Sequence, residues 1–156
     1  GGPFQRSNSV MDFISREKQA GLDSLVPFEN LQANLDSMKN KINEFFKNIK
    51  HKNKTIGAYG AARSGTTLLC FFELGSIIDF IVDDNKEKHF KYSPGFGIQV
   101  LPVSSIYDKN PDYLVILAWM HSETIINKNI DFLEQGGKFI NIHPEFEIVD
   151  VDSIKT

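Results

Sequence analysis

The residue types best suited to bind an anion lie together in the run Gly57-Ala58-Tyr59-Gly60-Ala61-Ala62-Arg63-Ser64-Gly65-Thr66-Thr67. Apolar segments on both sides of this run give the order strand, glycine turn, helix. Proteins of the α/β class use such a turn to present backbone N–H groups to a phosphate or carboxylate, because glycine lets the backbone approach closely. Arg63 adds a fork of donors, and Ser64 and Thr66 add hydroxyls. The sequence therefore predicts an anion-binding turn, with a tight turn that holds no ligand as the alternative.

The spacing of the glycines narrows the class of ligand. Gly57, Gly60 and Gly65 do not fit G-x-G-x-x-G, so the dinucleotide fingerprint is missed. Gly60 and Gly65 do fit the two glycines of G-x-x-x-x-G-K-[ST], but Thr66 stands where that motif has its lysine. Without the ammonium group the turn should not hold the β- and γ-phosphates of ATP, which excludes an ATPase.

Two further groups of residues follow predicted strands. Asp83 and Asp84 lie about 20 residues after the glycines, where nucleotide-binding folds place an acid for a ribose hydroxyl. A solvated turn is the alternative. Trp119 and His121 lie at the carboxyl end of the most apolar strand, the edge where ligands of open α/β sheets bind. Trp119 is suited to stack on a base or sugar, or to cover the core. His121 has no partner visible in the sequence, so we do not expect it to be catalytic.

The first third of the chain, residues 1–52, has a helical pattern and precedes the segment that contains the glycine turn. One helix is predicted from Ser9 to Ala20, and a longer one from Pro27 to Ile49. The longer helix carries apolar residues at alternating steps of three and four: Phe28, Leu31, Leu35, Met38, Ile42, Phe45 and Ile49. This pattern is typical of a coiled-coil dimer or of a single stripe that packs on this domain or a neighbouring one. We favour the stripe, because the seam is short.

Residues 53–156 alternate strand and helix patterns, which indicates βαβ units. Strands are predicted at 54–59, 77–82, 98–101, 113–119 and 138–142, with an edge strand at 147–151, and helices at 66–74, 102–108 and 122–135. The segment Tyr113–Trp119 shows no polar alternation, so we expect it at the sheet centre with both faces buried. The predicted fold class is α/β, a Rossmann-like parallel sheet flanked by helices and preceded by an N-terminal helical segment.

The bulk composition excludes several classes of partner. The chain has 156 residues and a net charge of −3, with scattered rather than clustered cations, so we expect no nucleic acid partner. No Cys and His cluster has zinc spacing, and no apolar run is long enough to cross a membrane. Cys70 is the one cysteine, so no intrachain disulfide forms, and we expect it in the core. A cytoplasmic location is expected, and the start Gly1-Gly2-Pro3 without Met indicates a fragment or a trimmed chain.

The order of these motifs resembles the C-terminal domain of the S-adenosylmethionine-dependent sugar C-methyltransferases, which methylate a carbon of a nucleotide-linked deoxysugar. The resemblance covers almost the whole chain, and its most distinctive part is Tyr59-Gly60-Ala61 with Gly65 and Thr67-Leu68-Leu69. The remaining matches, in chain order, are Gly1-Gly2, Gly21-Leu22, Ile78-Asp79, Val82-Asp83, Tyr92 with Pro94-Gly95, Pro111-Asp112-Tyr113, Leu117-Ala118-Trp119 and Gly136-Gly137-Lys138-Phe139-Ile140. The departures from the family pattern fall in the ligand loops, at Ser64, Thr66, Gly97 and Met120.

The resemblance implies that residues 1–52 and 53–156 together form one C-terminal domain of a larger methyltransferase. Zinc-binding and methyl-donor domains upstream of it would carry out the chemistry. The expected partners are then a nucleotide-sugar and the upstream methyl-donor domain. S-adenosylmethionine is the cofactor of the parent enzyme, and none is bound by this domain alone. The resemblance implies no catalytic residue here; the expected substrate-binding residues are Tyr59, Gly60, Ala61, Arg63, Ser64, Gly65, Thr66, Asp83, Trp119 and His121.

Two other functions stay open at this point. One is an NAD(P)-dependent oxidoreductase-type dinucleotide-binding domain, against which the imperfect glycine fingerprint argues. The other is a non-catalytic docking or dimerisation module, which would form a homodimer through the Phe28–Ile49 helix.

Overall fold

A computed structural model describes residues 7–154, so the Gly1-Gly2 pair lies outside the described residues. The chain divides into two compact units, Gly1–Ser37 and Met38–Thr156. The first unit contains helix α1 (Asn8–Gln19) and the first part of helix α2 (Val26–His51). The second contains the rest of α2 and an α/β sheet. The domain boundary expected at residue 52 stays a prediction.

Six strands form one sheet in the second unit, in the order β3-β2-β1-β4-β5-β6. All neighbours pair in parallel except β5 and β6, which pair antiparallel at one edge. The strands are β1 (Ile56–Tyr59), β2 (Phe80–Val82), β3 (Val100–Leu101), β4 (Tyr113–Ile116), β5 (Lys138–Asn141) and β6 (Glu147–Val149). The order reverses between β1 and β4, as in doubly wound nucleotide-binding folds, and this confirms the predicted fold class.

The prediction for the central strand is also confirmed. Leu114, Val115 and Ile116 of β4 have no exposed surface, and β4 lies between β1 and β5. Val115 packs on one face of the sheet, and Leu114 and Ile116 pack on the other. Burial of both faces explains why the sequence of this strand lacks polar alternation.

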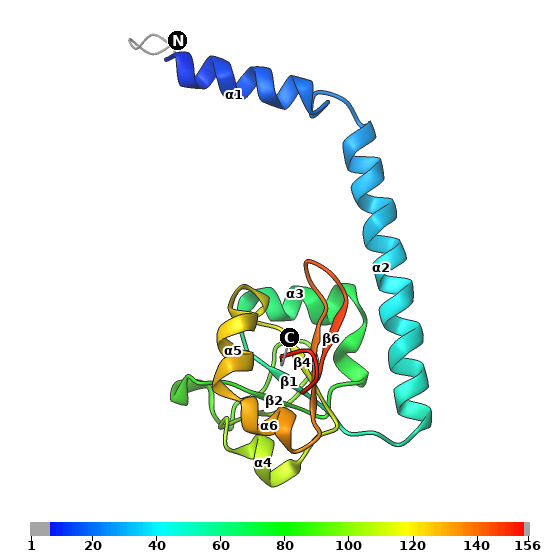
Figure 1. The fold of residues 1–156 in the computed structure, drawn as a ribbon, viewed down its shortest axis with the longest axis vertical. Helices are drawn as coiled ribbons and strands as arrows, with labels where there is room; N and C mark the ends of the chain where they lie inside the picture. Colours follow the sequence, from blue (N-terminus) through cyan, green and yellow to red (C-terminus); the bar gives the residue numbers. More distant parts are fainter. Residues whose placement is uncertain (1–6, 155–156) are drawn as a thin grey trace. The chain divides into compact units, whose positions relative to one another are not determined.

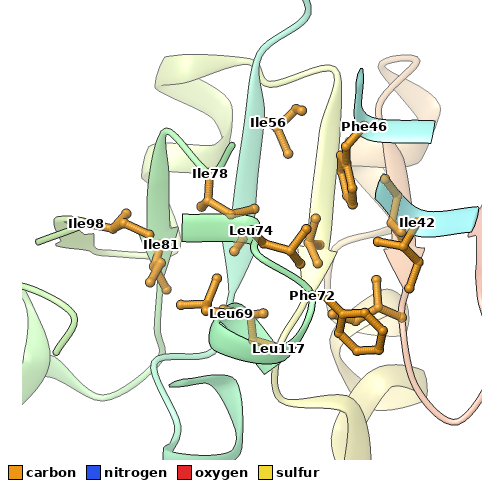
Figure 2. Packing of buried hydrophobic residues seen from close by; sticks show 14 of the residues in the cluster. Ile42, Phe46, Ile56, Leu69, Phe72, Leu74, Ile78, Ile81, Ile98 and Leu117 are labelled. Carbon is orange, nitrogen blue, oxygen red and sulfur yellow. The ribbon is translucent and has the colours of Figure 1, made fainter. Parts of the chain in front are cut away.

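Helices cover both faces of this sheet (Figure 1). The helix α3 and the second part of α2 pack on one face, and the other face is covered by α4, α5 and α6. The bounds are α3 (Arg63–Phe71), α4 (Ser105–Lys109), α5 (Ser122–Lys128) and α6 (Ile130–Glu134), with short 3-10 turns η1 (Leu74–Ser76), η2 (Lys86–Lys88) and η3 (Trp119–His121). Figure 2 shows Leu74 between Ile42 of α2 and Ile81 of β2 within the first of these cores.

Several local predictions were wrong. The strands predicted at 77–82 and 113–119 are shorter, because the first begins at Phe80 and the second ends at Ile116. Helix α3 begins at Arg63 rather than at Thr66. The single helix expected over 122–135 is interrupted at Asn129, whose side-chain amide donates to Ile125 O at 2.7 Å and competes with the helical backbone bonds. Cys70 is exposed rather than in the core, because the sheet-facing side of α3 is formed by Leu69 and not by its neighbour.

The apolar stripe of α2 behaves differently along its length. Ile42, Phe46 and Ile49 are buried in the second unit. Phe45 is half-buried and makes edge-on ring contacts with Phe46, Tyr113 and Phe146, at centroid distances of 5.5, 5.9 and 5.2 Å. In the first unit, the stripe residues Phe28 and Leu31 are exposed and Leu35 is partly buried. Packing on this domain thus accounts for the second part of the stripe, and the homodimer stays a prediction.

Acidic side chains hold the amino ends of the central strands. Asp112, before β4, accepts from Thr55 N–H at 2.9 Å and from Lys54 Nζ at 2.7 Å. Asp79, before β2, accepts from Ile56 N–H at 2.9 Å. These bonds fix the register of β1 against both of its neighbours. No described helix is long and apolar enough to span a membrane.

The outer edge of β3 is also paired. The chain between η2 and β3 turns back, so that Phe90 N–H donates to Val100 O at 2.7 Å and Val100 N–H donates to Lys91 O at 2.8 Å. Tyr92 and Gln99 form an antiparallel bridge next to them. The backbone of the loop predicted over 86–97 is therefore bonded along the outer edge of β3.

We expect Phe46→Ala to lower the free energy of unfolding by about 3–5 kcal/mol, because it leaves a cavity between α2 and the sheet. The matched control is Phe28→Ala on the same helix, which makes the same substitution but removes an exposed ring and should cost less than about 0.5 kcal/mol. Urea denaturation of both variants measures the difference. Equal losses would contradict the packing described for the second part of α2.

A second prediction concerns the acid before β4. Burial alone would raise the pKa of Asp112, but the bonds from Lys54 and Thr55 outweigh it and lower that pKa. Asp112→Asn should cost about 1 kcal/mol at neutral pH, a modest value because the pair is partly exposed. The contribution of Asp112 is complete above the ordinary carboxyl pKa of 3.8 and is lost as the pH falls through the lower folded-state pKa.

The stability difference between wild type and Asp112→Asn should therefore narrow below pH 3.8 and vanish in stronger acid. Thermal unfolding at several pH values measures it, with the exposed Asp108→Asn as the control. A difference that persisted unchanged in acid would show that the carboxylate charge contributes nothing.

Candidate functional site

The carboxyl ends of β1, β2 and β4 meet at a very tight backbone crossing. Gly60 follows β1 with φ +101°, and a Cβ placed on it would lie 2.5 Å from the Cβ of Ala118, just past β4. Its N–H donates to Val82 O at 2.8 Å. Only glycine satisfies both the dihedral and the approach. Gly60 thus brings the turn after β1 against the ends of both neighbouring strands.

Asp83 fixes the turn from the other side. Its carboxylate is nearly buried and accepts from Ala61 N–H at 2.7 Å, Asn85 N–H at 2.8 Å and Lys88 Nζ at 3.0 Å. Its backbone carbonyl pairs with His89 Nε2 at 2.8 Å. The residue that the sequence suggested for a ribose hydroxyl therefore joins the turn after β1 to the segment after β2.

Tyr59 and Asp84 form a second link between the same two strand ends. The Tyr59 hydroxyl donates to Asp84 Oδ2 at 2.9 Å. Burial raises the pKa of Tyr59, and the hydrogen bond and charge of Asp84 act in the same direction. The phenol therefore stays protonated at neutral pH and acts as a donor.

Helix α3 points its amino end toward this edge of the sheet. Its N-cap residue is Ala62, which has no side-chain acceptor to cap the helix. Gly65, in the first turn, is packed against Leu117, where an added Cβ would lie 3.1 Å from the Leu117 Cβ. The first N–H groups of a helix lack intrahelical acceptors and carry a partial positive charge, which favours an anion. Arg63 and Ser64, also in the first turn, are exposed.

Two hollows of about 380 Å³ each flank this helix end. We call the first the trough; it lies between α3 and the segment 87–94, over Ile81 of β2 and Val100 of β3. We call the second the switch-point hollow; it lies between the ends of β1 and β4, and its lining includes Asp84 and His121. Three residues line both hollows, namely Gly60, Ala62 and Lys88.

The structure brings most of the predicted site residues to these hollows. The trough is lined by Gly60, Ala61, Gly65 and Thr66, and the switch-point hollow by Tyr59, Gly60, Asp83 and His121. Arg63 and Ser64 stand beside them on the exposed helix end. Trp119 lines neither; its half-buried ring packs edge-on against His143 at a centroid distance of 4.4 Å.

Sequence reasoning missed several lining residues. Lys88, Lys91, Tyr92 and Ser93 belong to the segment read as a polar loop, and all four line the trough. Thr124 and Lys128 of α5 line the switch-point hollow. A signal was available for one of them, because Tyr92 with its Pro-Gly turn was among the family matches. Among the described residues no group of three His, Cys, Asp or Glu could hold a metal ion.

Residues 2–144 match the family model described as the C-methyltransferase C-terminal domain. The chain belongs to this family. Every predicted site residue falls within the matched range. The residues that line the two hollows also lie within the range matched by the family model.

A curated relative of this C-methyltransferase C-terminal domain is the C-methyltransferase NovU of Streptomyces niveus, 28% identical over 146 residues. The match covers 93% of this chain and 35% of the relative, so the chain spans about a third of that protein. Among solved structures, a UDP-D-quinovosamine 4-dehydrogenase from Vibrio fischeri aligns with a TM-score of 0.46 and 15% identity, over 65% of this chain and 97% of that one.

The Gly60 crossing gives a testable prediction for this C-methyltransferase C-terminal domain. Gly60→Ala should lower the free energy of unfolding by about 2–4 kcal/mol, the sum of left-handed backbone strain and overpacking against Ala118. Gly95→Ala is the control, because Gly95 has φ +80° but open space where a Cβ would stand, so only the strain of about 1 kcal/mol applies. Chemical denaturation compares the two. A Gly60→Ala variant no less stable than Gly95→Ala would refute the close approach.

Proposed function

We propose that this C-methyltransferase C-terminal domain binds a nucleotide-linked sugar at the carboxyl edge of its sheet, for methylation by an upstream part of a longer enzyme. The observation that carries the proposal is the placement of the α3 amino end between two hollows that share Gly60, Ala62 and Lys88. A diphosphate held at that point would have room for a group on each side. Membership of the C-methyltransferase family supplies the reaction class.

The charges around the α3 amino end suit a diphosphate. Three kinds of donor lie at or beside the shared residues: the first N–H groups of α3, the guanidinium of Arg63, and the ammonium of Lys88, which donates to Asp83 and has further hydrogens to donate. Arg63 heads the helix, where its planar fork can bind two phosphate oxygens. We therefore assign Arg63, Ser64 and Thr66 to phosphate binding, and Tyr59, Ala61 and Asp83 to holding the turn in shape.

The methyl donor of the whole enzyme would be S-adenosylmethionine, which supplies an electrophilic methyl group. The residues here do not fit that cofactor. The one buried acid at the end of β2, Asp83, already accepts from three protein donors, which leaves it little capacity to accept from the two hydroxyls of a ribose. The same argument disfavours NAD(P). This domain would bind and orient the substrate, and the donor would come from the upstream part.

Isothermal titration of the chain with dTDP-, UDP-, GDP- and CDP-sugars tests the proposal, with NADH and S-adenosylmethionine as controls. One class of nucleotide-sugar is expected to bind. Arg63→Ala should weaken that binding by about 10- to 100-fold, since hydrogen bonds to charged groups contribute about 1.5–3 kcal/mol. Its melting temperature should be unchanged, because Arg63 is exposed.

Arg16→Ala on α1 is the matched control, because it removes an exposed arginine far along the chain from the turn. Arg63→Lys keeps the charge and removes the fork, so it should lie between wild type and Arg63→Ala. Equal binding by Arg63→Ala would remove Arg63 from the site. No heat with any nucleotide-sugar would contradict the proposal for this chain.

A further inference from the structure

The trough exists because one crossover of the fold has no helix. Parallel strands are usually joined by a helix that covers the sheet between them. The connection from β2 to β3 contains only the short turn η2 and the segment that pairs with the outer edge of β3. The side chains of Ile81 and Val100 therefore lie at the floor of an open hollow, and Leu69 of α3 forms its wall (Figure 2 shows Leu69 and Ile81).

The two hollows differ in the chemistry of their linings. The trough combines an aliphatic floor with one exposed aromatic ring, Tyr92, at its rim. The switch-point hollow is lined by carboxylates and by the polar side chains of His121, Thr124 and Lys128. A flat, largely apolar ring suits the first lining, and a group with many hydroxyls suits the second.

We propose that the trough is the nucleobase subsite of the nucleotide-sugar, with Tyr92 stacking on the base and Lys91 contacting the phosphate nearest to it. This inference rests on the proposed function and specifies which part of the ligand lies in which hollow. The diphosphate then crosses the residues that the hollows share, and the sugar lies in the switch-point hollow. The methylated carbon would thus be held over the ends of β1 and β4.

Polar groups in the trough are placed to read the base edge. Ser93 is buried, and its Oγ accepts from Ile98 N–H at 3.1 Å, so its own hydrogen can be donated to a ring carbonyl. Glu87, at the same lining, can accept from a ring N–H. A base that offers one acceptor and one donor along its edge is matched by this pair.

The position of the base can be observed directly by NMR of the chain with labelled isoleucine methyl groups. Ile81 lines the trough, Ile125 lines the switch-point hollow, and Ile140 lines neither. The probes are dTDP, UDP, GDP and CDP, with inorganic pyrophosphate as the ligand without a base. A nucleoside diphosphate should shift the Ile81 methyl signal, and pyrophosphate should not, because ring currents come from the base.

Variants test the same assignment through affinity for the nucleotide-sugar. Tyr92→Ala should weaken binding by roughly 5- to 100-fold, the range for loss of base stacking on an aromatic ring. Tyr92→Phe should bind like wild type. Phe90→Ala is the matched control, because Phe90 is equally exposed and two residues away but does not line the trough. Lys91→Glu should also weaken binding. Its matched control is Lys86→Glu, because Lys86 does not line the trough.

The outcomes separate this inference from the proposed function. Loss of affinity with Tyr92→Ala, together with unchanged affinity for pyrophosphate and a shift at Ile81, would support the subsite. Nucleotide-sugar binding with a shift at Ile125 in place of Ile81, or with Tyr92→Ala and Phe90→Ala indistinguishable, would overturn the subsite and leave the proposed function intact. No binding of any nucleotide-sugar would overturn both.

Discussion

The buried carboxylate of Asp83 is the interaction on which the rest of this edge of the molecule depends. It accepts from the backbone of the turn after β1 and from the backbone and lysine of the segment after β2. An anion with little exposure needs such donors to offset its lost hydration. Asp83 thus ties the start of α3 to the start of the segment after β2, and the bonds of that segment to β3 complete the wall of the trough.

The part of the site closest to the sequence signal was predictable. The position of Gly60 and of the first residues of α3 at the carboxyl edge of the sheet could be predicted, because a strand, glycines and a helix follow one another directly in the sequence. Their role in binding stays a prediction. The role of Asp83 could be placed only to within its strand end. Its partner Ala61 is 22 residues away, and nothing in the identity of an alanine says that its N–H needs an acceptor.

In helix α2 too, the sequence pattern predicted the element but not which of its side chains are buried. Periodicity predicted the long α2 helix but could not show that Phe46, outside the heptad, is buried while Phe28, inside it, is exposed. The exposure of Cys70 has the same cause, because the start and rotation of α3 decide whether Leu69 or Cys70 faces the sheet. For the central strand β4 the sequence did predict burial, because a strand that is covered on both faces shows a continuous run of apolar residues.

The segment that walls the trough also closes the sheet. Parallel β3 would otherwise present unpaired N–H and C=O groups to solvent, and such an edge is a template for strands of other chains. The bonds from Phe90 and Lys91 to Val100 occupy those groups within the same molecule. The proposed ligand binding and the resistance to aggregation would therefore depend on the same short stretch of backbone, and an insertion or deletion there would affect both.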